Sequence, residues 1–190
     1  MKIPFNITIR RIHKEDASEL EYIGRKTFYD TFTGTCTEED MAGFLDVVFS
    51  PEQIKTDLSD PEDYFFWALV DGKPAGYLRV KEDYASFEYM RKWKALELKR
   101  LYVLSEFHGQ GVAHALMEFA VEFAKTNDYQ VIWLGVWEHN YRARRFYEKS
   151  GFSNSGHTHD FPIGNTPQTD CWYWQFLNGT TPEAALGADI

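Results

Sequence analysis

Apolar and polar residues alternate in short runs along most of the chain, and this period of two predicts β-strands. Two of these runs flank Asp71-Gly72, a dipeptide typical of a tight hairpin turn. Another run is apolar almost throughout and predicts a strand buried on both faces. The strands are expected at residues 7–11, 64–70, 74–80, 96–103, 130–136, 152–160 and 170–177.

Helical spacing of apolar residues appears between the first two strands and again after the fourth. The first helix should begin near residues 14–16, and Thr37 should cap a second. Ser50-Pro51 predicts a third helix, because serine is a good N-cap and proline suits the first helical position. Two later helices are expected over residues 112–125 and 140–150.

The predicted element order is a strand, helices, a hairpin, and then strand, helix, strand, helix, strand, strand. Such an order is typical of an α/β fold whose sheet has strands of mixed direction. A helix between two strands places them parallel, so one parallel pair is expected at the centre. A ligand is expected at the C-terminal edge of that pair.

The central strand breaks its own alternation. Apolar residues occupy even positions at Leu96 and Leu98 but odd positions at Leu101 and Val103. The alternation therefore shifts by one residue across Lys99-Arg100. A β-bulge at this point is the simplest explanation. Because a bulge leaves backbone groups unpaired, an extended ligand could form hydrogen bonds along residues 101–103 as an added strand would.

The loop after this strand has features of a phosphate site. Gly109 and Gly111 allow close backbone approach, and a helix follows them with free amides and a positive dipole end. A dinucleotide fingerprint is disfavoured because His114 stands where Gly or Ala is needed, and the Gly-Lys-Ser/Thr of a P-loop is absent. A simple tight turn before a helix remains the alternative.

These motifs resemble the acetyl-CoA site of the GNAT superfamily of N-acetyltransferases. The resemblance is carried by residues 100–103, by 108–113, where His108 replaces the usual Gln or Arg, and by 140–152. It implies a mixed, mostly antiparallel central sheet with a splayed parallel pair and helices on both faces. It also implies acetyl-CoA as cosubstrate, bound by Leu101, Tyr102, Val103, His108, Gly109, Gln110, Gly111, Val112, Ala113, Asn140 and Tyr147.

Two residues are candidates for the chemistry. The resemblance places Tyr147 opposite the CoA sulfur, and a phenol is suitably matched to protonate a thiolate. Glu97, on the central strand, could take a proton from the acceptor ammonium directly or through water. Packing on the sheet is the alternative for Tyr147, and a solvated strand carboxylate is the alternative for Glu97.

Charge is distributed unevenly over a chain of 190 residues with net charge −9. Residues 1–90 carry 10 Lys and Arg against 18 Asp and Glu, whereas residues 91–150 carry 10 against 7. The basic segment holds the proposed site for the anionic cosubstrate, and the acidic segments suit a cationic acceptor. Asp30, Glu97 and Asp160 are the residues expected to bind that acceptor. The net negative charge argues against nucleic-acid binding.

A narrower resemblance concerns the acceptor. Residues 27–32, 95–103 and 159–170 resemble the PaiA-type polyamine acetyltransferases, which act on spermidine or spermine. We therefore expect acetyl transfer to a primary amine by direct attack in a ternary complex, with a polyamine as the favoured acceptor. A protein N-terminus or lysine, an amino acid, an aminoglycoside, or a CoA-binding sensor without turnover are the alternatives.

The remaining expectations concern organisation and surroundings. One N-acetyltransferase domain is expected over residues 1–177, followed by a tail over 178–190. A cytoplasmic location without membrane association is expected, since no apolar segment is long enough for an anchor or a signal peptide. His157, His159 and Asp160 lack further ligands at metal spacing, so no metal is predicted. Aromatic clusters are typical of a core or a dimer surface, so a homodimer is one possible state of the protein.

Overall fold

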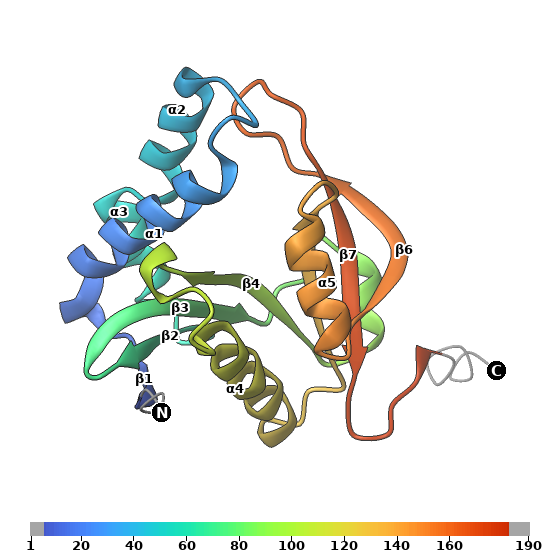
Figure 1. The fold of residues 1–190 in the computed structure, drawn as a ribbon. Coiled ribbons are helices and arrows are strands. Elements are labelled where there is room, and N and C mark those ends of the chain that lie inside the picture. The colour runs from blue at the N-terminus through green and yellow to red at the C-terminus, as the bar shows by residue number, and fades with distance from the viewer. Residues whose placement is uncertain (1–5, 183–190) are drawn as a thin grey trace.

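The computed structural model describes residues 6–182, which form one twisted sheet flanked by helices. The strand order across the sheet is β1-β2-β3-β4-β5-β7-β6, and β4 and β5 are its parallel neighbours (Figure 1). All other neighbouring pairs are antiparallel. The strands are β1 (Ile7–Arg11), β2 (Asp63–Val70), β3 (Lys73–Lys81), β4 (Ala95–Val103), β5 (Val131–Trp137), β6 (Ser153–Asp160) and β7 (Thr169–Phe176). The predicted fold class is confirmed.

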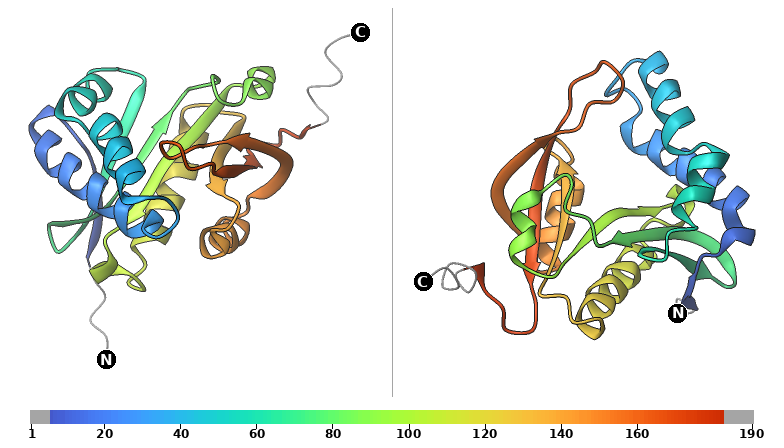
Figure 2. Two further views of the ribbon diagram at one scale, coloured as in Figure 1. Left: turned by 90° about the horizontal axis from the view of Figure 1, so that it is seen from above. Right: turned by 180° about the vertical axis from the view of Figure 1, so that it is seen from behind.

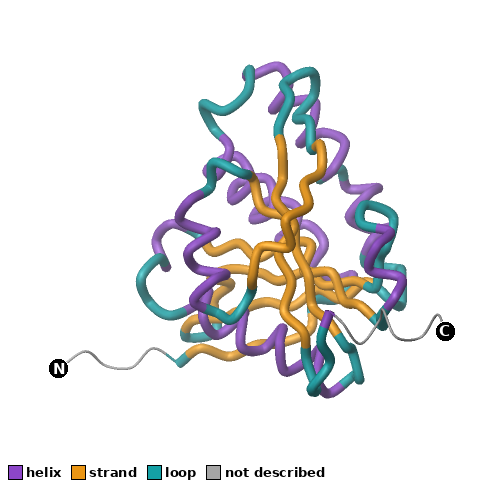
Figure 3. Tube along the Cα trace, turned by 90° about the vertical axis from the view of Figure 1, so that its right-hand side faces the viewer, coloured by secondary structure: helices purple, strands orange, loops and turns teal. Residues whose placement is uncertain are grey.

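Helices cover both faces of this sheet (Figure 3). One face carries the first three helices, and the other carries α4 with α5 beside it. The helices are α1 (Ala17–Phe32), α2 (Glu38–Val48), α3 (Pro51–Asp57), α4 (Val112–Thr126) and α5 (Tyr141–Lys149). The segment between β3 and β4 contains a short 3-10 turn at Glu88–Lys92.

Local sequence signals set the helix ends as predicted. The Thr37 side chain accepts a hydrogen bond from the Asp40 amide at 3.1 Å, and Ser50 caps the helix that Pro51 opens. Each cap satisfies an amide that the first helical turn leaves without a partner. At the end of α5 the chain leaves the helix through Gly151, whose φ is 93°.

Two of the three apolar clusters among the described residues lie between these layers. One lies between the sheet and α4, around Leu78, Leu96 and Leu116. The other lies between the sheet and α1 to α3, around Phe49, Phe65 and Trp67. Because β4 contributes residues to both clusters, its side chains are held firmly on each face of the sheet.

The two halves of the sheet separate along the parallel pair. β4 and β5 pair over Ala95–Glu97 and Val131–Trp133 and then diverge, which opens the V shape seen in Figure 1. The bulge occurs where it was predicted, because Arg79 faces Arg100 and Val80 faces Leu98, which leaves Lys99 as the extra residue. The divergence creates space for a ligand at the C-terminal ends of the two strands.

The far end of this opening is bridged by two segments distant in sequence. The α1–α2 region and the β6–β7 connection meet there, as the views in Figure 2 show from above and behind. Asp40 accepts hydrogen bonds from the Asn165 amide and the Thr166 hydroxyl, both at 2.8 Å. Gln168 donates to the Thr35 carbonyl at 3.1 Å. These contacts join the two halves of the molecule across the opening.

Within residues 6–182, no helix has the length and apolar character needed to cross a bilayer. The expected domain boundary before residue 178 stays a prediction, since the tail extends to residues 183–190, outside the described part of the chain.

Candidate active site

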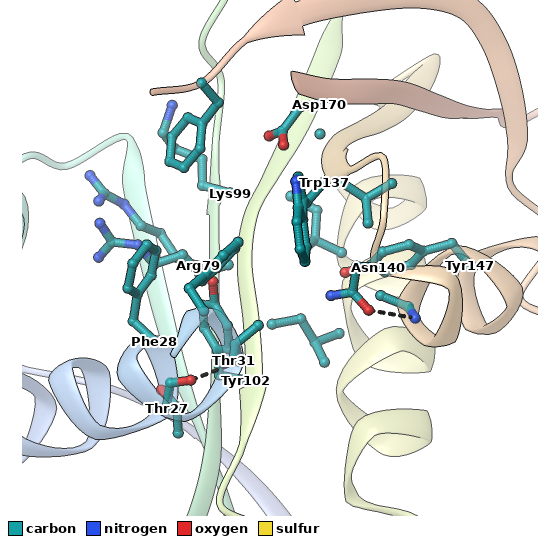
Figure 4. Close-up of a pocket in the computed structure, with 18 of the residues that line it drawn as sticks. Thr27, Phe28, Thr31, Arg79, Lys99, Tyr102, Trp137, Asn140, Tyr147 and Asp170 are labelled. Atoms are coloured by element: carbon teal, nitrogen blue, oxygen red, sulfur yellow. Dashed lines mark hydrogen bonds between the residues drawn. The ribbon is translucent and has the colours of Figure 1, made fainter. Parts of the chain in front are cut away.

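A cavity of about 800 Å³ occupies the opening between the two halves of the sheet. Its walls come from α1 and α2, from β3 and β4, from the ends of β5, β6 and β7, and from α5. Figure 4 shows side chains from these elements pointing toward one another across it. The predicted site residues that line it are Asp30, Glu97, Leu101, Tyr102, Val103, His108, Ala113, Asn140 and Tyr147.

One edge of β4 is free along this cavity. Residues 98 and 100–103 pair with β3 on one side, but β5 has already diverged on the other. The backbone groups on that second edge are therefore open to a ligand with amides of its own, such as a pantetheine arm. This arrangement agrees with the expectation that residues 101–103 bind the cosubstrate.

The glycine loop has the backbone geometry of an anion site. Gly109 and Gly111 have φ of 75° and 87°, in the left-handed region that favours glycine. No described backbone carbonyl accepts a hydrogen bond from the amides of Gly111, Val112 and Ala113. These amides start α4, so they point at the place where a phosphate would bind.

Side chains of the same loop are mostly engaged elsewhere. His108 Nε2 lies 2.9 Å from the Val103 carbonyl oxygen, and Gln110 donates to the Glu106 carbonyl at 2.9 Å. Val112 is buried in the core below the loop. The loop therefore offers its backbone amides to a ligand, and the replacement at position 108 ties the loop to the end of β4. Gly109, Gln110, Gly111 and Val112 lie outside the cavity wall.

Asn140 and Tyr147 belong to the helix on the far side of the opening. The Asn140 carboxamide oxygen accepts from the Ala143 amide at 3.1 Å and caps α5, while its nitrogen faces the cavity (Figure 4). Tyr147 lies about two turns further along the helix and also lines the cavity. Burial, with a smaller contribution from the Asp170 carboxylate, raises the pKa of Tyr147 to about 12.

Glu97 is in the cavity wall but has a cationic partner. Its carboxylate lies 2.8 Å from Lys99 Nζ, and that ammonium also contacts Asp83 at 3.0 Å. The side chain is almost fully buried, and burial raises the pKa of Glu97 although the Lys99 charge opposes the shift. A carboxylate held in this way is less available as a base than an unpaired one.

Asp170 is the carboxylate that the sequence interpretation did not assign to the site. It lies on β7 opposite Trp137 of β5, and its side chain points into the cavity (Figure 4). Gly135 of β5 leaves room for Trp172 and Asp170, since a Cβ there would lie 2.5 Å from the Trp172 ring and 3.0 Å from Asp170 Oδ2. Burial raises the pKa of Asp170 to about 7. The sequence feature that could have indicated Asp170 is a single charged residue near the start of an otherwise largely aromatic strand.

The two other predicted acceptor-binding carboxylates are placed differently. Asp30 lines the cavity, but it forms an ion pair with Lys26 at 2.7 Å and its side chain is 41% exposed. Asp160 ends β6 on the exposed edge strand and is not in the cavity wall. The structure therefore does not bring Asp160 together with Asp30 and Glu97.

His157 and His159 lie against aromatic rings. His159 stacks on Trp172 at a centroid distance of 5.1 Å, and His157 lies 5.4 Å from Phe87. Among residues 6–182, no cluster of three or more His, Cys, Asp or Glu side chains is arranged to hold a metal ion.

Known proteins are similar to this chain in sequence and in fold. Residues 25–152 match the acetyltransferase (GNAT) family. An uncharacterized N-acetyltransferase encoded in the pepI 3′ region of Lactobacillus delbrueckii subsp. lactis is 35% identical over 164 residues, which cover 86% of this chain and 94% of that protein. The chain belongs to the GNAT family of acetyltransferases.

More distant GNAT-type proteins extend the comparison. The PaiA N-acetyltransferase of Thermoplasma acidophilum, solved in complex with coenzyme A, has a TM-score of 0.73 at 22% identity, covering 90% of this chain and 99% of that one. That likeness concerns the fold. The N-acetylaspartate synthetase of Danio rerio is 30% identical over 118 residues, which cover 58% of this chain and 39% of that protein.

Family membership makes the protein an acyltransferase that takes an acetyl group from acetyl-CoA. Its own residues fit that cosubstrate. The free edge of β4 suits the amides of the pantetheine arm, and the left-handed glycines before α4 suit its pyrophosphate. When bound, acetyl-CoA supplies the thioester that an amine attacks.

Proposed function

We propose that the protein acetylates a primary amine by direct transfer, with Asp170 as general base and Tyr147 as general acid. The proposal rests on two titratable groups, Asp170 and Tyr147, that line the same cavity. Their surroundings give them different pKa values, about 7 for Asp170 and about 12 for Tyr147. Asp170 is able to accept a proton near neutral pH, whereas Tyr147 keeps its proton throughout the working range.

The proton balance assigns each residue one task. As the amine nitrogen bonds to the acetyl carbon, it releases one proton, which we assign to the Asp170 carboxylate. As the carbon–sulfur bond breaks, the departing sulfur needs one proton, which we assign to the Tyr147 hydroxyl as donor. Asp170 then holds one extra proton and Tyr147 lacks one, and solvent in the open cavity can carry the proton from Asp170 back to Tyr147.

Glu97 remains a second hypothesis for the base. Its position at the bulge of β4 supports the hypothesis, but its ion pair with Lys99 stabilises the carboxylate and lowers its tendency to accept a proton. Substitution of each carboxylate by its amide separates these assignments, because loss of the true base lowers turnover about 10²-fold or more.

Release of the CoA thiol in the presence of a panel of amines tests the proposed function directly. Spermidine, an amino acid, a lysine peptide and an aminoglycoside represent the acceptor classes. We expect thiol release that depends on one class and yields its acetylated product. Binding of CoA without turnover of any amine would instead favour a CoA-binding sensor.

A polyamine acceptor is the finer hypothesis from the sequence. The acidic balance of residues 1–90 supports it, and so does the fold shared with a PaiA protein. Its weakness is that Asp30 and Glu97 already have cationic partners and Asp160 lies outside the cavity wall. If a polyamine is bound through acidic side chains, KM for spermidine should rise with ionic strength between low salt and about 0.1 M, where screening acts over about 10 Å. A KM that does not change with salt would remove this hypothesis.

A further inference from the structure

Cationic side chains gather in the wall of the cavity that β3 and β4 form. They are Arg79, Lys99 and Arg100. Two of the three are neutralised by nearby carboxylates: Arg79 lies 3.0 Å from Asp57 and 2.5 Å from Asp63, and Lys99 lies 2.8 Å from Glu97. These two cations therefore belong to internal ion pairs and have little attraction left for a ligand.

Arg100 differs from both. No described carboxylate forms an ion pair with its guanidinium, and the polar group that interacts with it is the neutral Tyr77 hydroxyl. Its Nη1 is shielded from solvent without a partner, and its Cζ lies 4.4 Å above the Phe49 ring. Burial lowers the pKa of Arg100, and the Arg79 charge adds to this shift, while Tyr77, Tyr102 and Asp57 oppose it.

The carboxylates of the cavity show the opposite imbalance. Asp30 is paired with Lys26 and Glu97 with Lys99, while Asp170 has no cationic partner among the described residues. Arg100 and Asp170 are thus a cation and a carboxylate without ion-pair partners in the same cavity, and they do not pair with each other. Arg142 also lines the cavity without an ion pair, but it is exposed. A ligand with one group of each sign would match Arg100 and Asp170.

Tyr102 lines the same cavity as Arg100 and Asp170. Burial is the main reason why the pKa of Tyr102 is raised, but Arg100 opposes the shift while Tyr147 and Asp170 add to it. The hydroxyl therefore lies within electrostatic reach of the cation on β4 and of the proposed acid and base. A small acceptor beside Tyr102 could contact Arg100 at one end and Asp170 at the other.

We infer that the acceptor is a small amine that also carries a carboxylate, and that Arg100 binds this carboxylate while the amine faces Asp170. The inference rests on the proposed acetyltransferase function and specifies its acceptor class. A guanidinium suits the role because it binds a carboxylate through two parallel hydrogen bonds and remains charged when buried. A polyamine is disfavoured, because it would bring further positive charge toward a cation that has no counter-ion.

Matched acceptors on the wild-type enzyme provide the first test. Amino acids, with the amine alpha or beta to the carboxylate, are compared with their carboxamides and with spermidine in the thiol-release assay. The free acids should have kcat/KM values about 10²-fold above those of the amides. Amine basicity cannot produce this preference, because the amide has the lower amine pKa and hence more neutral amine at pH 8.

Substitution of the guanidinium provides the second test. Arg100→Gln should lower kcat/KM for the free acids about 10²-fold and leave kcat/KM for the amides within about threefold, so that the preference disappears. Arg100→Lys should restore part of it. Arg91→Gln changes an exposed arginine outside the cavity and should preserve the preference.

Thermal unfolding and CoA affinity establish that the Arg100 variants are folded, since the side chain also packs on Phe49. Amides or spermidine that react as well as the free acids in the wild-type enzyme would overturn the inference and leave the acetyltransferase function standing. Failure of every amine, with CoA bound, would overturn both. A preference for free acids that survives Arg100→Gln would overturn the role of this residue.

Discussion

The carboxylates on the two walls of the cavity differ in their charge partners. On the β4 wall, Glu97 is buried and ion-paired with Lys99 at 2.8 Å. On the β7 wall, Asp170 is also largely shielded from water, but no described cation neutralises it. Burial raises the pKa of both groups, but only the Glu97 shift is opposed by an adjacent charge. The comparison indicates that Glu97 is part of an internal ion pair, whereas Asp170 remains free to react.

The same contrast holds for the arginines. Arg79 is held by two aspartates and fixes the junction of β2, β3 and α3, whereas Arg100 has no such partner. Paired charges in a protein interior are a structural device, and an unpaired one lowers stability unless a ligand matches it. Unpaired groups in a cavity are therefore the better candidates for binding and catalysis.

The largest expected effect is that of Asp170→Asn on turnover. Loss of the general base should lower kcat about 10²- to 10⁴-fold. In the wild-type enzyme at saturating acceptor, kcat should fall about tenfold per pH unit below about 7, because protonated Asp170 cannot accept a proton, and level off above it.

Glu97→Gln is the control and should lower kcat less than tenfold, since Lys99 keeps Asp83 as partner. A larger loss with Glu97→Gln than with Asp170→Asn would reverse the comparison of the walls.

Tyr147→Phe should lower kcat about 10²-fold with little change in CoA affinity, because only the proton donor to the leaving sulfur is lost. The pKa of about 12 predicts no loss of rate from Tyr147 ionisation up to about pH 11. Tyr141→Phe on the same helix removes an exposed hydroxyl and is the matched control. Wild-type turnover in Tyr147→Phe would return this residue to a packing role.

Gly111→Val should weaken CoA binding about tenfold or more. A branched residue at φ of 87° is strained and would move the amides that start α4, although the space around a Cβ is open. Gly34→Val, at φ of 78° with no atom near its Cβ, applies similar strain outside the loop. Calorimetric titration of both variants with CoA separates the two effects. Equal affinities in folded proteins would argue against the loop as the phosphate site.

The smallest expected effect is on stability. Because the pKa of Asp170 is raised to about 7 in the folded state, the unfolded state releases this proton at lower pH. The carboxyl group therefore favours folding fully at acidic pH, and this contribution is lost as pH rises toward 7. Asp170→Asn should thus raise the free energy of unfolding by about 1–2 kcal/mol at pH 8 and by less at pH 5. Denaturant titrations at the two pH values measure the difference, and an equal or negative change would contradict an unpaired carboxylate.

Sequence patterns predicted the architecture well for identifiable reasons. Thr37, Ser50 and Gly151 are local signals whose effect depends on a few neighbouring residues, so the helix ends were predictable. The slip of alternation at Lys99 is equally local and located the bulge. Family membership and the use of acetyl-CoA followed from motifs of this kind and are confirmed.

The charge partners could not be predicted in the same way. Asp160 and Asp170 are both acidic residues in strands near the C-terminus, yet only Asp170 reaches the cavity. His159 of β6 pairs with Asp170 and lines the cavity with it, so the adjacent Asp160 points to the other face of the sheet. The ion pair of Lys99 with Asp83 depends on the path of the segment before β4. Net charge counted along the chain therefore indicated an acidic surface but not which charges remain unpaired in the site.

The sequence by itself determined the elements, their order, the bulge, the glycine loop and the family, because each depends on short-range backbone preferences or contiguous motifs. Only the tertiary structure decided which acidic and basic side chains meet. That outcome depends on strand order, on the divergence of β4 from β5, and on the absence of a side chain at Gly135. The physical reason is that ion pairing and burial act through space, so the proton affinity of Asp170 and the free charge of Arg100 exist only once distant segments are packed together.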